Sequence, residues 1–164
     1  MLKKFFMGIL LFTILIHNIT SYDSLYGTYI KSIKTKNYKG EEITFPDEKL
    51  VTTVLFFDMG NKYHNNIISQ FNHLLINLKL QDIRFNLICV SNGKIEDFQK
   101  LIDRLHLQAQ LVNDQNNKIS DIFNISCNSC FHLFIIDNSL ILRYFSSKYD
   151  PIFVREILER YIKE

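Results

Sequence analysis

Hydrophobic residues recur along this chain with two different periods, which predict strands alternating with helices. From Val51 to Asp58 nearly every residue is apolar or β-branched, as in a strand buried on both faces, and the segment from Ile83 to Ser91 predicts a second buried strand. A spacing of three and four residues follows each run and predicts two amphipathic helices. Their apolar positions are Ile67, Ile68, Phe71, Leu74, Leu75 and Leu78 in the first helix, and Ile95, Phe98, Leu101, Ile102 and Leu105 in the second.

Shorter patterns complete the order of elements. Thr28 to Ile33 and Glu42 to Phe45 flank a turn at Gly40 and predict an N-terminal β-hairpin. The later segments predict a short strand at 109–112, a helical turn at 118–123, strands at 132–137 and 140–145, and a helix that Asp150 caps and Pro151 begins. The order β-β-β-α-β-α-β-α-β-β-α predicts one α/β domain, a three-layer sandwich with helices flanking a central mixed sheet.

The N-terminus has the arrangement of a secretory signal peptide. Lys3 and Lys4 precede the apolar run from Phe5 to Ile16, and polar residues lead from there to Ser21. The run is shorter than the roughly 20 residues of a spanning helix. We therefore expect residues 1–21 to be a signal peptide, or an uncleaved N-terminal membrane anchor, and residues 22–164 to form the domain. Export of this kind predicts a bacterial protein in the periplasm or another extracytoplasmic compartment.

Charge and composition narrow the functional classes. Without Lys3 and Lys4 the chain carries 17 basic and 17 acidic residues, so it has no net charge and no basic stripe for nucleic acid. The sequence contains no glycine-rich phosphate loop, no Ser-His-Asp signature and no paired catalytic carboxylates. These observations predict neither nucleic-acid binding nor a cofactor.

Cys127 and Cys130 form the one local arrangement that predicts chemistry. They flank Asn128 and Ser129, which are turn formers, and a turn would bring the two thiols close enough for a disulfide. Such a pair can be a redox dithiol, a structural disulfide, or part of a metal site. Cys89 lies within a buried-strand pattern and is expected to be an inert core thiol.

The order of elements resembles that of the thioredoxin-like superfamily, in particular its thioredoxin-like and peroxiredoxin-like branch with an N-terminal hairpin. Val54–Phe57 is similar to the family's first central strand, which leads into the active-site loop. Phe134–Asp137 is similar to the strand that follows the family's cis-proline. Asp114, followed by Ile119, Phe123 and Ile125, resembles the family's segment after its third strand. The resemblance implies a thioredoxin-like fold over about residues 27–164.

Two departures from the family pattern bear on mechanism. The stretch that matches the family's redox motif, from Asn61 to His64, contains no cysteine, which excludes standard thioredoxin and peroxidase catalysis. Phe131 stands where the family has its cis-proline, so we expect a trans peptide bond there. The active-site motif is therefore degenerate, while Cys127 and Cys130 fall in the cis-proline loop, which in the family faces the first long helix.

The resemblance implies a cleft with two cysteines on its rim. We expect Cys127 and Cys130 to catalyse thiol–disulfide exchange, and a protonated His64 to stabilise a thiolate. The alternatives are a non-catalytic binding module with a structural disulfide, or a copper- or zinc-handling protein that uses these cysteines with His64 and His132. In each case the partner is a protein or peptide in the cleft, which is lined by Asp58, Asn61, His64, Phe131 and His132.

Overall fold

The computed structural model describes residues 26–81, 84–125, 127 and 130–162, so the predicted signal peptide lies outside the described residues. The elements follow one another in the predicted order. They are β1 (Ile33–Lys36), β2 (Glu42–Phe45), β3 (Thr52–Phe56), α2 (Lys62–Lys79), β4 (Asn86–Ser91), α3 (Ile95–Leu105), β5 (Gln110–Asn113), α4 (Lys118–Ile122), β6 (His132–Ile136), β7 (Leu142–Ser146) and α5 (Pro151–Ile162). No helix in the described part of the chain is long and apolar enough to cross a membrane.

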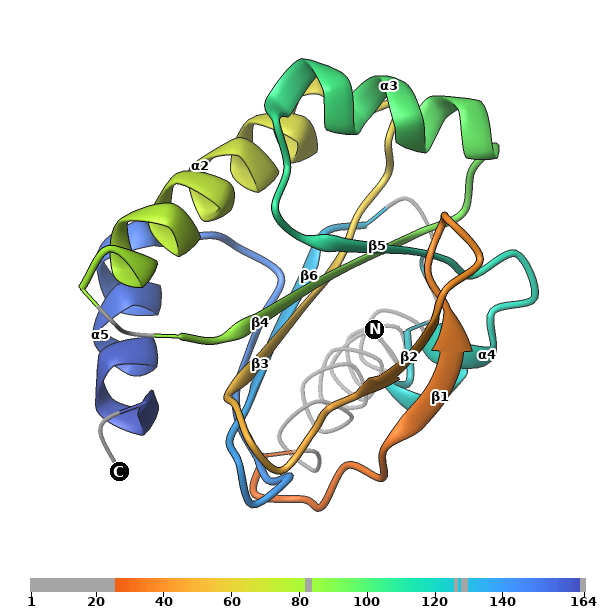
Figure 1. Cartoon of the computed structure of the whole chain (residues 1–164). Coiled ribbons are helices and arrows are strands. Elements are labelled where there is room, and N and C mark those ends of the chain that lie inside the picture. The colour runs from red at the N-terminus through yellow and green to blue at the C-terminus, as the bar shows by residue number, and fades with distance from the viewer. Residues whose placement is uncertain (1–25, 82–83, 126, 128–129, 163–164) are drawn as a thin grey trace, which may run out of the picture.

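Five strands form a mixed central sheet in the order β5-β4-β3-β6-β7, and β1 and β2 form a separate hairpin (Figure 1). The β3 strand pairs parallel to β4 and antiparallel to β6, with Phe56 opposite His132. The β4 and β5 strands are also parallel, whereas β6 and β7 are antiparallel. This confirms the predicted α/β sandwich and its mixed sheet.

Helices cover the sheet on both faces and enclose two hydrophobic cores. On one face α2, α3 and α5 pack over a core that includes Leu55, Phe71 and Leu133. On the other face α4 and the hairpin pack over Phe56, Phe123 and Phe134. Because side chains alternate along a strand, β6 sends Leu133 to the first core and Phe134 to the second.

The two outer strands of the sheet each bind a segment of main chain beyond the sheet. Tyr38 in the hairpin turn donates its N–H to the carbonyl of Leu111 in β5 at 2.9 Å. At the opposite side Gly27 donates its N–H to the carbonyl of Leu142, at the start of β7, at 2.9 Å. The hairpin and the segment before it thus span the sheet from one edge to the other.

The first strand begins later than predicted. The sequence pattern placed it at residues 28–33, but β1 covers Ile33–Lys36. Tyr29 instead forms an antiparallel bridge with Ile141, at the far side of the sheet from β5. The earlier prediction was wrong because the apolar pattern shows that residues 28–30 are extended but does not show which strand they pair with.

Candidate functional site

Cys127 and Cys130 form a disulfide across a tight turn at the entry to β6. Their Cα atoms are 5.4 Å apart, and the N–H of Cys130 donates to the carbonyl of Cys127 at 3.2 Å. This confirms the predicted turn, although Asn128 and Ser129 themselves lie outside the described residues. Both cysteines are half-buried, so the disulfide is neither enclosed in the core nor fully exposed.

The amino end of α2 lies where the family pattern would place a redox motif, and it is closed by Asn61. The Asn61 side-chain oxygen accepts the N–H of Tyr63 at 2.9 Å and the N–H of His64 at 3.4 Å. These are the free N–H groups of the first helical turn, which an N-cap residue normally satisfies. Asn61 therefore occupies the position as a structural cap.

His64 is buried in the first turn of α2 and is uncharged at neutral pH. Its Nδ1 accepts the N–H of Asp58 at 3.1 Å, so the neutral ring carries its proton on Nε2. Burial lowers the pKa of His64, and the Asp58 carboxylate offsets only part of this effect. A lowered pKa disfavours the imidazolium that the sequence predicts at His64, and so weakens the expected stabilisation of a thiolate.

Asp58 closes the loop between β3 and α2. Its carboxylate accepts the N–H of Gly60 at 2.8 Å, and its own N–H is the group that holds His64. Both contacts are local hydrogen bonds of a short turn. The half-buried Asp58 therefore lies at the predicted place, where it supports the loop.

Phe131 and His132 lie on opposite faces of β6. Phe131 belongs to the core under α2, and its ring centroid is 5.8 Å from that of His64. His132 stacks on Phe145 on the other face, with ring centroids 5.9 Å apart. The structure thus brings Phe131 to His64, with both side chains buried. The bond before Phe131 is trans, because the cis bond among the described residues is Phe45–Pro46.

His132 is buried, and its pKa is lowered by that burial and further by the neighbouring His64. Neither histidine therefore carries a charge at neutral pH. Within the described residues no group of three or more His, Cys, Asp or Glu side chains is placed to hold a metal ion. The predicted metal set of two cysteines and two histidines is not assembled, and both sulfurs are used in the disulfide.

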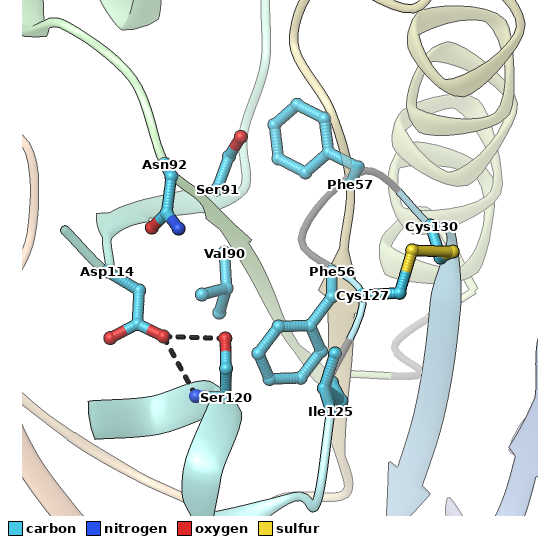
Figure 2. Close-up of a pocket in the computed structure, with 10 residues that line it drawn as sticks. All are labelled: Phe56, Phe57, Val90, Ser91, Asn92, Asp114, Ser120, Ile125, Cys127 and Cys130. Carbon is cyan, nitrogen blue, oxygen red and sulfur yellow. Dashed lines mark hydrogen bonds between the residues drawn. A yellow bond between two sulfur atoms is a disulfide. The ribbon is translucent and has the colours of Figure 1, made fainter. Parts of the chain in front are cut away.

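A small cavity adjoins the disulfide on the α4 side of the sheet (Figure 2). Its volume is about 10 Å³, the lower limit for a single water molecule. The polar groups that line it are Ser91, Asn92, Asp114 and Ser120. A cavity of this size cannot hold a substrate.

The sequence pattern does not predict any of these four polar residues as part of the site, although Asp114 belongs to a segment that resembles the family. Ser91 is the last residue of β4 and Asp114 follows β5, and the carboxyl ends of parallel strands meet at one edge of a sheet. That rule is the signal that could have identified them. Asp114 accepts the N–H of Ile119 at 3.0 Å and both the N–H and the hydroxyl of Ser120 at 2.8 Å, so its carboxylate is engaged at the start of α4.

The two buried histidines make stability depend on pH. Each has a pKa below the ordinary value near 6.5, so the unfolded chain binds protons at a higher pH than the folded chain. The contribution of the two histidines to the free energy of unfolding is fully present above about pH 6.5 and is lost as the pH falls below that value. The loss is at most about 1.4 kcal/mol per pH unit for each histidine. Urea unfolding at several pH values between 7.5 and 5 should show this slope.

Two variants test whether the buried histidines cause this pH dependence of the free energy of unfolding. His132→Phe keeps a planar ring next to Phe145 and should flatten the dependence, because one titrating group is removed. His73→Gln, at an exposed position of α2, should leave the slope as in the parent protein. Equal slopes in all three proteins would contradict the assignment to buried histidine.

Comparison with solved structures identifies similar proteins at low sequence identity. A thiol:disulfide interchange protein of Bacteroides sp. is 17% identical, with a TM-score of 0.68, and the match covers 85% of this chain and 91% of the other. A thioredoxin-family interchange protein of Chlorobium tepidum is 14% identical, with a TM-score of 0.68 and coverage of 83% and 97%. A peroxidoxin of Mycobacterium tuberculosis is 11% identical, with a TM-score of 0.68 and coverage of 84% and 96%.

The sequence comparisons add no closer relationship. No protein-family model matches the chain, and no curated protein sequence matches it. Similarity at these identities shows the fold, and the site must be interpreted from its own residues.

Proposed function

Because this chain has the thioredoxin-like fold, we propose that it carries out thiol–disulfide exchange through Cys127 and Cys130. The observation that supports this most directly is the half-buried disulfide at the entry to β6. A redox disulfide must be reached by the thiol of another protein, and a fully buried one could not be. Closure of the pair by a four-residue turn keeps both sulfurs within reach of each other in the reduced state.

The proposed reaction exchanges two electrons between two proteins. A thiolate of the reduced partner attacks the sulfur of Cys127, the bond between Cys127 and Cys130 breaks, and Cys130 leaves as a thiolate that takes up a proton. The second thiolate of the partner then attacks the mixed disulfide and releases Cys127. The partner is oxidised to a disulfide, and the Cys127–Cys130 pair is reduced to a dithiol. The opposite direction follows the same steps in reverse.

We expect this exchange to be slow compared with a site at a helix amino terminus. The free N–H groups of α2 are bound by Asn61, and His64 and His132 are uncharged at neutral pH. Helix termini and nearby cations are the usual means of stabilising a thiolate. Without them, specificity for one protein or peptide partner would have to come from surfaces next to the disulfide.

A structural disulfide is the second candidate, and the hydrogen-bonded turn supports it. The N–H of Cys130 donates to the carbonyl of Cys127, so the disulfide and a main-chain hydrogen bond close the same turn. For so short a loop the expected chain-entropy contribution is about 2 kcal/mol. In this case the protein would be a binding module that holds a peptide in the cleft without catalysis. The signal-peptide pattern supports an exported, extracytoplasmic protein in either case.

A redox titration of the Cys89→Ser variant separates the two candidates. This variant leaves two titrating thiols, because Cys89 is buried and free in the parent protein. An exchanging pair should titrate above about −230 mV, whereas a structural disulfide should lie below about −300 mV. Thiol counting by mass spectrometry at each potential gives the midpoint. A disulfide that is reduced only after denaturation would rule out the exchange function.

A further inference from the structure

A groove separates the hairpin turn from the loop that follows β5. It has a volume of about 640 Å³, which is within the roughly 300–1,000 Å³ of typical ligand sites. Its two walls are the turn at residues 36–40 and the loop at 113–118. The hydrogen bond from Tyr38 to Leu111 ties the hairpin turn to β5, so the groove has a fixed base.

Three lysines on the two walls make the groove basic. Lys36 and Lys39 come from the hairpin and Lys118 from the start of α4, and all three are exposed. None of them forms an ion pair with a carboxylate of the described residues. The acidic residue of the lining is Asp114, whose carboxylate already accepts three hydrogen bonds from the backbone and side chain of α4.

The charges of the groove are spread over both of its walls. Lys36 and Lys39 lie on the hairpin wall and Lys118 on the opposite wall, and all three are exposed. Three separate cations can meet several carboxylates at once, whereas one small anion would engage only part of them. The groove therefore suits an acidic peptide segment better than it suits a bare anion.

The groove and the small cavity share one lining residue. Asp114 lines both of them, and Figure 2 shows it in the small cavity, across Val90 and Phe56 from Cys127 and Cys130. We propose that the groove binds an acidic segment of the protein whose thiols exchange with Cys127 and Cys130. This inference rests on the proposed exchange function, since it names the class of substrate for that site. The lysines would hold the partner while its thiol approaches the disulfide.

Binding is tested first, with the oxidised protein and probes that contain no cysteine. The probes are a five-residue peptide with three aspartates and the same peptide with three asparagines. We expect the acidic peptide to bind about tenfold more tightly, with this preference shrinking to about twofold in 0.5 M NaCl. Isothermal titration calorimetry or NMR titration measures both affinities. Shifts confined to the hairpin turn and the 113–118 loop would locate the peptide.

A matched pair of triple variants assigns the binding to the groove. Replacing Lys36, Lys39 and Lys118 by glutamine should abolish the preference for the acidic peptide. Replacing the exposed lysines Lys49, Lys79 and Lys148 by glutamine removes the same charge elsewhere and should leave the preference intact. Equal loss in both triple variants, or equal binding of the two peptides by the parent protein, would overturn the inference.

Exchange is tested second, with the same two peptide sequences extended by a pair of cysteines. The parent protein should oxidise the acidic dithiol about tenfold faster than the neutral one, and the groove variant should oxidise both at the neutral rate. If the protein oxidises the acidic and neutral dithiols at equal rates, the proposed exchange function stands and the proposal that the groove binds an acidic segment is wrong. If the protein binds the acidic peptide selectively but oxidises neither dithiol, the groove still binds acidic peptides and the proposed exchange function is wrong.

Discussion

A Cys130→Ser variant should accumulate a mixed disulfide with its partner, whereas Cys127→Ser should lose exchange altogether. In the reducing direction the Cys127 thiolate attacks the disulfide of an oxidised partner and releases one partner thiol. The serine at position 130 cannot then displace the partner from Cys127, so the reaction stops at the mixed disulfide, before one turnover is complete. With serine at position 127, no sulfur remains at the position that the partner attacks. The rate should then fall to that of the uncatalysed reaction between small thiols.

The measurement is mass spectrometry of each variant after incubation with a dithiol peptide and its disulfide. The Cys89→Ser variant is the control, because Cys89 is fully buried and burial raises the pKa of its thiol. It should exchange at the parent rate. If both loop variants lose only about 2 kcal/mol of stability and trap no partner, the disulfide is structural. A trapped adduct on Cys130 in Cys127→Ser would reverse the two roles.

Phe134→Ala should destabilise the protein by about 3–5 kcal/mol, the range for removing a buried phenylalanine. Phe134 is fully buried in β6, and its ring centroid is 4.7 Å from that of Phe123 and 4.8 Å from that of Phe145. Alanine would leave a cavity between β6, β7 and α4. These neighbours are held by strand pairing, so they can close the cavity only in part.

Urea unfolding at pH 7.5 measures this loss. Phe153→Ala is the matched control. Phe153 lies on α5 with 46% of its surface exposed, and its ring centroid is 5.4 Å from that of Tyr144. This substitution should lower the free energy of unfolding by no more than about 1 kcal/mol. A similar loss in the two variants would contradict the placement of Phe134 in the core. The loop that carries the disulfide continues into β6. The Phe134→Ala substitution should therefore also make the disulfide easier to reduce.

The sequence predicted most of the fold because local patterns determine most of it. Asp150 accepts the N–H of Ile152 at 3.0 Å and that of Phe153 at 3.1 Å, as its position before Pro151 predicted. The apolar period of α2 likewise indicated its buried face. Strand partners are not local properties, which is why the segment near Tyr29 was assigned to the hairpin although it pairs with Ile141.

The site was predicted in outline, but its charges were not. The turn at Cys127 and Cys130 and the missing cysteines at the start of α2 can both be read from residue types and spacing. The charge of His64 cannot, because it depends on how deeply the ring is buried and on the N–H of Asp58 that reaches it. The basic groove likewise combines Lys36 and Lys118, which lie far apart in the sequence.

The contact between Tyr38 and β5 has a consequence for assembly. An outer strand with free main-chain groups is a template on which another chain can add a strand, either a partner peptide or a second copy. The hydrogen bond to Leu111 occupies such a group in a strand of only four residues. The hairpin therefore hinders the addition of another strand to the β5 edge of the sheet. Shortening the hairpin would expose this edge of the sheet and make aggregation through it easier.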